Sequence, residues 1–276
     1  MDDSTAPLLQ VRDATCLAVQ SLPSGKAPAS EAASPAFGVQ QSGGPRAAAD
    51  SPMPAIFRGI DLDVRPGEIL DLVGPSGSGK SSLLTCIARL NPRADARLTL
   101  EGTDADDMSV EQWRTRVAYL PQKSLLPGDT VRQAILLPYS FASMRGAHAP
   151  DDERIRTALD AVGLADVELT RDPHDLSGGQ AARVSMIRSI LTFPKVLLAD
   201  EVDAGLDDDN ARLVGAYMAD FAHRTGMALI RVRHRAPDGL ADATATLAGG
   251  IITVRPAANR HDAQSVQSVQ SERSIR

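Results

Sequence analysis

The sequence predicts an α/β fold with a mostly parallel sheet at its core, on three observations. Strand-like apolar runs alternate with helical patterns between residues 56 and 232, a glycine-rich loop joins one of these strands to a helix, and residues 196–199 are apolar throughout. An unbroken apolar run is typical of a strand covered on both faces. The chain has 276 residues, of which 43% are hydrophobic and 23% charged, so it can bury a sizeable core.

The N-terminal part predicts strands separated by a flexible segment. Residues 8–11 and 16–19 are short apolar runs compatible with edge strands, and we expect them to form an antiparallel β edge. Residues 20–54 are rich in Ala, Ser, Pro and Gly and lack apolar periodicity, which predicts a flexible insertion. Between residues 60 and 64 apolar and charged residues alternate, and this period of two predicts a half-buried strand.

The next elements form a strand–loop–helix unit followed by a short helix and a strand. Residues 69–73 are the predicted strand, and they run directly into the glycine-rich loop and an apolar helical pattern. Ser109 and Gln112 have the spacing of a capping box, which predicts a helix start at this point. Residues 117–120 then read as a strand.

The remaining elements predict a helical lobe inserted into the α/β core. Residues 123–193 are mostly helical in pattern and would form this lobe. The strand at 196–199, a helix at 208–225 and a strand at 227–232 then restore the α/β alternation. Residues 256–276 are polar and of low complexity, so we expect a disordered tail.

Composition and charge restrict the classes of partner. The net charge of −6 and the nine aromatic residues (one Trp, three Tyr, five Phe) argue against nucleic acid as the main partner. Cys16 and Cys86 are too few for a disulfide framework or a thiolate zinc site, which is typical of the reducing cytosol. No apolar run approaches the roughly 20 residues that cross a bilayer, so a membrane role would come through a partner.

The glycine-rich loop carries the strongest chemical signal. It fits the pattern G-x-x-x-x-G-K-[ST] and lies between a strand and a helix, as a phosphate-binding loop requires, so the fold prediction narrows to a P-loop NTPase (RecA-like). Backbone N–H groups of such a loop surround phosphate oxygens, Lys80 adds a positive charge, and Ser81 would ligate Mg²⁺. The predicted nucleotide-binding residues here are Gly74, Pro75, Ser76, Gly77, Ser78, Gly79, Lys80, Ser81 and Ser82.

Two carboxylates follow the apolar strand at 196–199. Asp200 and Glu201 stand at its carboxyl end, which is where ligands bind in open α/β sheets. Asp200 can hold Mg²⁺ through the water shell of the metal, and Glu201 can orient or deprotonate a water that attacks a phosphate. An Asp-Glu pair alone would more often be a solvated turn, but beside a phosphate loop it predicts catalysis.

A second glycine-fronted helix start lies within the helical lobe. Ser177 would cap this helix, and its first residues are Gly178, Gly179 and Gln180. Such a helix start is another anion-binding surface, although the chain has only one phosphate loop. A composite site shared between two subunits would explain this combination.

With these motifs in place, the chain resembles an ATP-binding cassette ATPase, the motor subunit of ABC transporters. Leu-Ser-Gly-Gly-Gln at 176–180 matches the signature motif of that family, and the resemblance covers residues 8–254 outside the insertion. It implies a single ATPase domain over residues 1–255, Mg²⁺ and ATP as cofactors, and a homodimer in which each ATP lies between the phosphate loop of one copy and the signature of the other. It also implies a membrane permease as partner and a peripheral location on the cytoplasmic face of the membrane.

The resemblance assigns roles to further residues. Gln122 matches the residue that senses the γ-phosphate and Mg²⁺ and links the helical lobe to the permease. His234 resembles the switch histidine that contacts the γ-phosphate, and residues 203–207 resemble the loop that crosses the dimer interface. Catalysis is therefore predicted for Glu201, Gln122 and His234, and metal binding for three residues: Ser81, Gln122 and Asp200.

The sequence departs from the family at a few positions. Many cassettes have a Tyr near the end of the first strand to stack on adenine, whereas Ala18 stands at the aligned position. Phe37 or Phe57 could replace it, although Phe57 fits the core better. Arg233 stands where the family usually has Ser or Thr, and Gly205 loosens the interface loop. None of these changes removes a predicted catalytic group, so we expect an active ATPase.

Other functions compete with the transporter motor. A soluble ABC ATPase without a transport role usually has long coiled coils or two cassettes in one chain, and the sequence shows neither. A nucleotide-regulated binding module without hydrolysis is disfavoured by Glu201 and His234, and a P-loop kinase by the signature motif. Within the transporter class, residues 126–131 and 183–188 are most like the small iron- or metal-export type.

Overall fold

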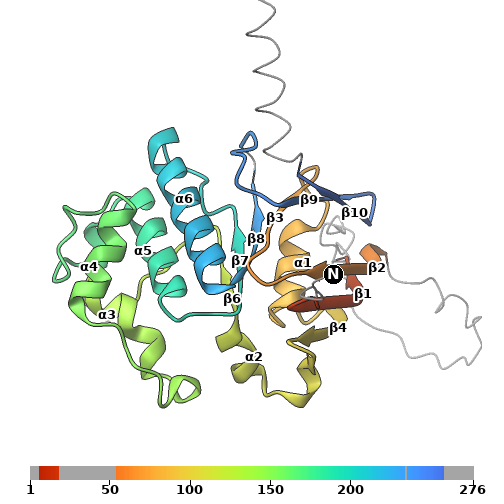
Figure 1. The fold of residues 1–276 in the computed structure, drawn as a ribbon, viewed down its shortest axis with the longest axis horizontal. Coiled ribbons are helices and arrows are strands. Elements are labelled where there is room, and N and C mark those ends of the chain that lie inside the picture. The colour runs from red at the N-terminus through yellow and green to blue at the C-terminus, as the bar shows by residue number, and fades with distance from the viewer. Residues whose placement is uncertain (1–5, 19–53, 234, 258–276) are drawn as a thin grey trace, which may run out of the picture.

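The computed structural model describes residues 6–18, 54–233 and 235–257, and it confirms the predicted α/β fold (Figure 1). The strands are β1 Leu9–Leu17, β2 Ala55–Val64, β3 Ile69–Val73, β4 Ala94–Leu100, β5 Thr103–Asp104, β6 Val117–Leu120, β7 Val196–Asp200, β8 Ala228–Val232, β9 Ala243–Ala248 and β10 Ile251–Pro256. The α-helices are α1 Lys80–Ile87, α2 Val110–Arg116, α3 Val131–Leu136, α4 Asp152–Ala161, α5 Gly178–Ile190 and α6 Asp208–Thr225.

The core of the molecule is a six-stranded sheet with the order β10-β9-β3-β8-β7-β6, in which only the β10–β9 pair is antiparallel. Every residue of β7 and β8 is buried. Because side chains alternate along a strand, Val196 and Leu198 join the apolar cluster that contains α1, whereas Leu197 and Ala199 join the cluster that contains α5 and α6. The predicted sheet with apolar cover on both faces is confirmed.

The antiparallel edge is a four-stranded sheet with the order β2-β1-β4-β5, and α1 packs between it and the parallel sheet. The prediction of two short strands at its start was wrong, since β1 is one continuous strand. Its polar middle lies at a register shift in the pairing, where Asp13 has a φ of 53° and its N–H donates to Asp61 Oδ1 at 2.8 Å. A bulge of this kind interrupts the alternation of apolar and polar residues by which a strand is predicted, so the two halves of β1 were predicted as separate strands.

The ends of β1 and β2 lie together, because Ala18 N donates to Pro54 O at 2.8 Å. The chain therefore leaves the sheet after β1 and returns to it at a neighbouring point. The predicted insertion at 20–54 falls outside the described residues except for Pro54, and so do Phe37 and the tail beyond residue 257. Phe57 is 1% exposed, which confirms its place in the core.

The strands β4, β9 and β10 were not predicted. β9 alternates Ala and Thr with a single Leu, and β10 is an exposed edge strand, so neither carries a strong apolar signal. Their pairing with β1, β3 and each other identifies them as strands. Non-local pairing of this kind is invisible in a window of sequence.

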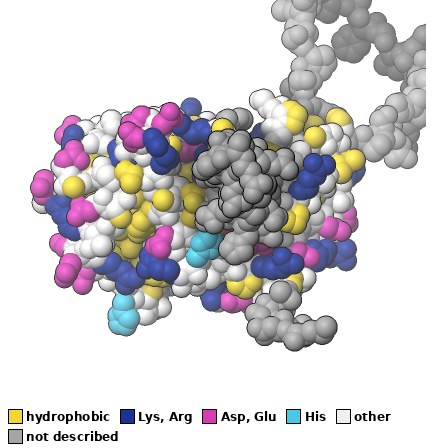
Figure 2. All heavy atoms as spheres, turned by 45° about the horizontal axis from the view of Figure 1, so that its top comes forward, with side chains coloured by type: hydrophobic (Ala, Val, Ile, Leu, Met, Phe, Trp, Pro, Cys, Tyr) yellow, Lys and Arg dark blue, Asp and Glu magenta, His cyan; other side chains and the backbone are white. Residues whose placement is uncertain are grey.

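The helical lobe contains α3, α4 and α5 and lies beyond β6 and β7, on the far side from α1 (Figure 1). The predicted capping box at Ser109 is present at the start of α2, and the predicted bounds of α6 agree with the structure. On the face displayed in Figure 2, acidic and basic side chains are interspersed without a zone of one sign. Among the described residues, none of the helices has the length and apolarity needed to span a bilayer.

Candidate nucleotide-binding site

Four neighbouring parallel strands bring the predicted site residues to one edge of the sheet. β3 ends at the phosphate loop, β7 ends at Asp200 and Glu201, and β6 ends two residues before Gln122. β8, which lies between β3 and β7, ends just before Arg233. Ligands of open α/β sheets bind outside these carboxyl ends, so the topology assembles one site from four distant segments.

At two positions of the phosphate loop, the backbone conformation and the neighbouring atoms leave room only for glycine. Gly74 has a φ of 149°, and a Cβ there would lie 2.1 Å from the carbonyl oxygen of Leu247 in β9. Gly79 has a φ of 100°, and a Cβ there would lie 2.6 Å from Ile56 Cγ2. The loop is therefore clamped between β9 and the antiparallel sheet, with its shape set before any ligand arrives.

The loop presents the groups that an anionic phosphate chain requires. Lys80 is 6% exposed, and its Nζ donates to Gly74 O at 2.9 Å and Pro75 O at 3.0 Å. Ser78 Oγ is buried and has no hydrogen-bond partner among the described residues. A buried ammonium held only by neutral carbonyls and an unpaired hydroxyl both gain from a bound anion, so the loop fits the phosphates of ATP.

Asp200 lies at the centre of the predicted metal site. It is 5% exposed, and its two oxygens accept hydrogen bonds from Ser81 Oγ and Tyr119 Oη, each at 3.0 Å. Hydroxyl and carboxylate oxygens suit Mg²⁺, which takes one or two carboxylates and completes its shell with water and phosphate oxygens. No cluster of three or more His, Cys, Asp or Glu side chains that could hold a metal occurs in the described part of the chain. The oxygen donors present fit Mg²⁺ that arrives with its nucleotide.

Tyr119 is a site residue that the sequence analysis missed. Burial raises the pKa of its phenol, and the nearby Asp200 carboxylate raises it further, so the hydroxyl stays protonated and acts as a donor. The signal was available, because Tyr119 is one residue from the end of a strand parallel to the Asp200 strand. The residue orients the carboxylate that we assign to Mg²⁺.

Glu201 and Gln122 are brought together by the fold. Gln122 Nε2 donates to Glu201 Oε2 at 2.8 Å, although 79 residues separate the two in the sequence. Glu201 has a φ of 52°, a left-handed conformation that is uncommon for a residue other than glycine, and its N–H donates to Val232 O at 3.2 Å. The predicted His234 lies outside the described residues.

The signature residues lie apart from the phosphate loop of the same chain. Ser177 caps α5, as predicted, and the structure adds a reciprocal capping box with Gln180; Ser177 and Gly178 are exposed. α5 belongs to the helical lobe, whereas α1 lies on the other side of β6 and β7 (Figure 1). A Cβ on Gly179 would lie 3.1 Å from Leu206 Cδ2, so the signature helix touches the 203–207 loop.

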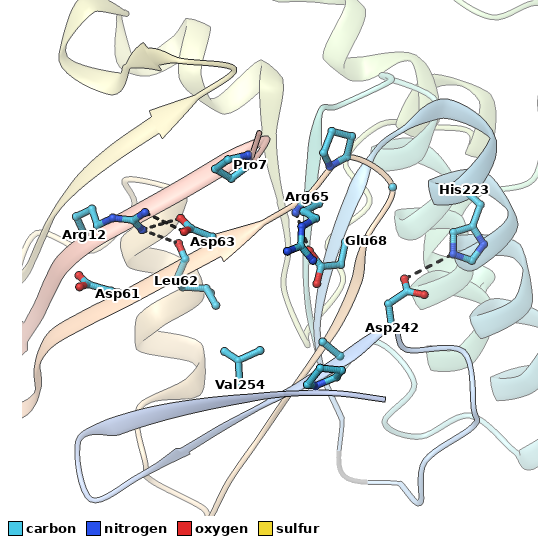
Figure 3. A pocket seen from close by; sticks show the side chains of 14 residues that line it. Pro7, Arg12, Asp61, Leu62, Asp63, Arg65, Glu68, His223, Asp242 and Val254 are labelled. Atoms are coloured by element: carbon cyan, nitrogen blue, oxygen red, sulfur yellow. Dashed lines mark hydrogen bonds and ion pairs between the residues drawn. The ribbon is translucent and has the colours of Figure 1, made fainter. Parts of the chain in front are cut away.

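A cavity of about 940 Å³ lies at the edge of the sheet opposite to the predicted site (Figure 3). It is lined by residues 65–68, which precede β3, and by Ala243 at the start of β9, so it opens at the amino end of these strands. Some of its charged side chains are paired with one another, for example Arg12 with Asp63 at 2.7 Å. None of the predicted site residues lines it.

Fold and site together define a P-loop NTPase, an α/β protein that binds nucleotide phosphates between a strand and a helix. The comparisons with known proteins narrow this class. The model of the "ABC transporter" family matches residues 57–204, which is more than half of the chain. The chain therefore belongs to the ABC transporter family, and it is an ATP-binding subunit that hydrolyses ATP with Mg²⁺ as cofactor.

Three relatives illustrate the breadth of that family. The "Probable iron export ATP-binding protein FetA" of Escherichia coli is 34% identical over 179 residues, covering 65% of this chain and 78% of the relative. The "Lipoprotein-releasing system ATP-binding protein LolD 2" of Caulobacter vibrioides is 38% identical over 186 residues, covering 65% and 79%. The "Methionine import ATP-binding protein MetN" of Rhizobium johnstonii is 32% identical over 204 residues, covering 72% of this chain but only 56% of the relative.

Solved structures agree on the fold. The ATP-binding cassette MJ0796, in a dimeric post-hydrolysis state bound to ADP and Pi, superposes with a TM-score of 0.68 at 20% identity, over 91% of this chain and 99% of the other. The ATP-binding subunit of an ABC transporter superposes with the same TM-score of 0.68 at 19% identity, over 90% of each chain. The predicted fold class, family and ATP-hydrolysing role are confirmed.

Proposed function

We propose that two copies of this chain pair head to tail and close on two molecules of Mg²⁺–ATP, and that this closure powers a separate membrane permease from the cytoplasmic face of the membrane. Each nucleotide lies between the phosphate loop of one copy and residues 177–180 of the other. The carrying observation is that the exposed start of α5 stands in a different lobe from α1, so one chain cannot apply both helix ends to the same nucleotide.

The residues of the site divide the chemistry of phosphoryl transfer between them. Mg²⁺–ATP, when bound, supplies the phosphoryl group and a metal charge that polarises it. Lys80 neutralises phosphate charge, and Ser81 with Asp200 holds the metal. Glu201 orients the attacking water and accepts its proton, a role that fits its hydrogen bond with Gln122 at 2.8 Å. His234 and Gln122 complete the set by contacting the γ-phosphate side, as the family resemblance implies.

A surface groove supports the proposed contact with the permease. The groove, of about 590 Å³, separates the core lobe from the helical lobe and is mostly apolar. Leu90 and Phe141 line it with 42% and 55% of their area exposed, which is unusual for large apolar side chains. Tyr119 also lines it and donates to Asp200, so a permease segment seated there would be linked to the metal site by one side chain.

The transported solute is set by the permease rather than by the cassette. The three relatives described above are named for iron export, methionine import and lipoprotein release, which are solutes of unrelated chemistry. One cassette fold serves all of them, so solute recognition lies outside the shared domain. The similarity of residues 126–131 and 183–188 to the small iron- or metal-export type concerns the cassette alone, so the permease identifies the solute and the direction of transport.

The decisive experiment is Glu201→Gln in the purified full chain. The variant keeps the size of the side chain and loses its basicity, so we expect it to bind Mg²⁺–ATP and to form a stable dimer. Steady-state ATP hydrolysis should fall by about 100-fold or more, because general-base assistance alone contributes about 10²–10⁴-fold. Gel filtration with and without ATP measures the dimer. Hydrolysis by the variant at the wild-type rate would refute the role of Glu201. A wild-type chain that stays monomeric with ATP and still hydrolyses it at the full rate would refute the composite site.

A further inference from the structure

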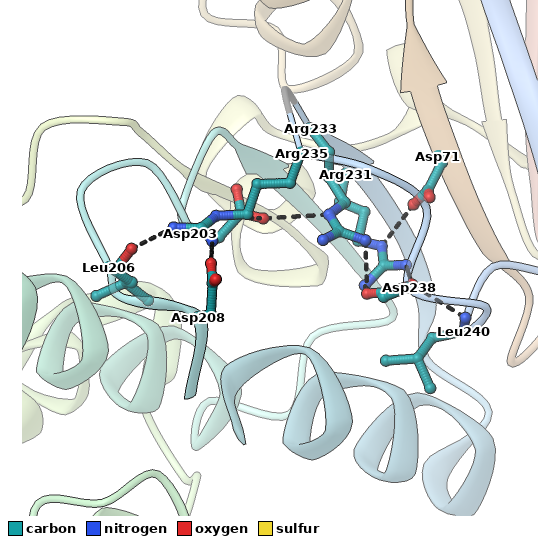
Figure 4. Close-up of polar contacts among 9 residues, drawn as sticks. All are labelled: Asp71, Asp203, Leu206, Asp208, Arg231, Arg233, Arg235, Asp238 and Leu240. Atoms are coloured by element: carbon teal, nitrogen blue, oxygen red, sulfur yellow. Dashed lines mark hydrogen bonds and ion pairs between the residues drawn. The ribbon is translucent and has the colours of Figure 1, made fainter. Parts of the chain in front are cut away.

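Three arginines occur at every second position where β8 ends, and together they form the most extensive ionic cluster near the site (Figure 4). Arg231 is the last but one residue of β8, and Arg233 and Arg235 follow it. Their partners are four aspartates from four different segments: Asp71, Asp203, Asp208 and Asp238. Arg233 is one of the positions at which the sequence departs from the family.

The inner part of the cluster joins the central strands. Arg231 Nε donates to Asp71 Oδ1 at 2.5 Å, and the two residues are register partners between β8 and β3. Both side chains are buried, with 3% and 9% of their areas exposed. Burial would lower the pKa of Arg231, but Asp238 and Asp71 raise it above its ordinary value, so the guanidinium stays charged. Removing either partner would leave a buried charge uncompensated, so the pair ties β8 to β3 in this register.

The outer part of the cluster attaches the loop after β7 to the end of β8. Arg233 Nε donates to Asp203 Oδ2 at 3.1 Å, and Arg233 Nη1 forms an ion pair with Asp238 at 2.6 Å. Arg235 donates to the carbonyl oxygen of Leu206 and pairs with Asp208. The side chains of Arg233 and Asp203 are 9% and 11% exposed, so water screens their interaction only weakly.

The loop held in this way connects the two halves of the proposed site. It begins at Glu201, whose left-handed backbone persists only if the surroundings hold it, and Asp203 is two residues further on. Near its end, Leu206 lies against Gly179 of the signature helix. A displaced loop would therefore move the base of one active site and the surface offered to the partner copy.

We propose that Arg233 is a positioning residue for ATP hydrolysis, acting through Asp203 to hold the loop of residues 201–207 in its hydrolysis-competent conformation. The inference rests on the proposed role of Glu201. Without the Arg233–Asp203 pair the loop samples other conformations, and the fraction of molecules with Glu201 in place falls. Among the described residues, the hydrogen bonds and ion pairs of Arg233 and Asp203 involve no residue of the phosphate loop, so we expect the affinity for ATP to stay unchanged.

The test is steady-state ATP hydrolysis by the full chain with Arg233→Ala, Asp203→Ala and the double variant. We expect each single variant to lower kcat about tenfold with KM for ATP within about twofold, and the double variant to lower it no further, since each single change already removes the Arg233–Asp203 interaction. Arg233→Lys should recover part of the loss, because it keeps the charge but not the planar fork. Arg212→Ala is the matched control, as it removes an exposed arginine paired with Asp209 on α6.

Several outcomes would overturn the inference. The inference is contradicted if Arg233→Ala keeps the wild-type kcat, or if the losses of the two single variants multiply in the double variant. It is also contradicted if a rise in KM accounts for the whole loss of kcat/KM. A purely structural role would lower the melting temperature and leave kcat below that temperature unchanged. If Arg233→Ala does not fold, Asp203→Asn answers the same question, because it preserves shape and removes only the charge. Loss of activity in Glu201→Gln together with normal Arg233→Ala would reject the inference and retain the proposed function.

Discussion

The helix α1 begins directly after Gly79 and α5 begins with Gly178 and Gly179, and both starts were predicted to bind anions, yet their first turns are built in opposite ways. The residue before α1, Gly79, is left-handed and makes no side-chain cap, whereas Ser177 caps α5 in a complete capping box. Neither helix has an acidic residue in its first turn, while α4 and α6 each begin with two acidic residues. Acidic side chains would occupy the positive end of the helix dipole, so α1 and α5 both leave it free for an anion.

The difference in capping indicates a difference in role. The N–H groups at the start of α1 have no cap and need a ligand, and the buried Lys80 adds a full charge beside them. The start of α5 satisfies two of its N-terminal groups with its own side chains and keeps its shape without a ligand. We infer that α1 holds the nucleotide within one chain and that α5 adds its contacts once a second chain brings the nucleotide.

The largest effect is expected for Lys80→Ala. The variant removes the charge from the uncapped helix start, so kcat/KM for ATP should fall by about 1000-fold, as for the loss of a preorganised charge-stabilising group. A nucleotide-binding titration and steady-state hydrolysis measure it. Lys195→Ala, which removes an exposed lysine paired with Glu101, should leave both unchanged. Normal ATP binding by Lys80→Ala would show that α1 is not the primary phosphate site.

One glycine-to-alanine substitution near the start of each helix distinguishes an effect on the backbone of the phosphate loop from an effect on the contact with the nucleotide. Gly74→Ala places a Cβ 2.1 Å from Leu247 O at a positive φ, so we expect a loss of about 3 kcal/mol and a fall in melting temperature of about 6–12 °C. Gly178→Ala meets nothing within 4 Å and should melt within about 2 °C of the wild type. It should nevertheless slow hydrolysis by the dimer, because a methyl group then faces the nucleotide of the partner. Equal melting curves for both variants would contradict the clamped loop.

The smallest effect is expected for the cap of α5. Ser177→Ala should cost about 1 kcal/mol of folding stability, the usual contribution of a serine cap, and should also reduce ATP-dependent dimer formation. Ser109→Ala removes the same capping box from α2, which carries none of the predicted site residues, so it should cost similar stability without changing the dimer. Denaturant unfolding and gel filtration with ATP measure the two quantities. Identical dimer formation in both variants would confine Ser177 to a structural role.

The sequence by itself determined the elements whose signals are local. The phosphate loop, the carboxylates after the apolar strand, the capping box at Ser109, the cap at Ser177 and the bounds of α6 all depend on residues a few positions apart, and the structure has them where they were predicted. Spacing within one turn or one strand fixes such contacts, because the backbone geometry of that short segment is the same in any fold.

Tertiary structure alone decided which distant segments meet. The continuous strand β1, the unpredicted strands β4, β9 and β10, and the hydrogen bond between Gln122 and Glu201 all depend on pairing between segments far apart in the chain. The same holds for Tyr119 on Asp200 and for Arg233 on Asp203. Long-range pairing is selected by the burial of the whole sheet and by compensation of buried charge, and neither quantity exists until the chain has folded.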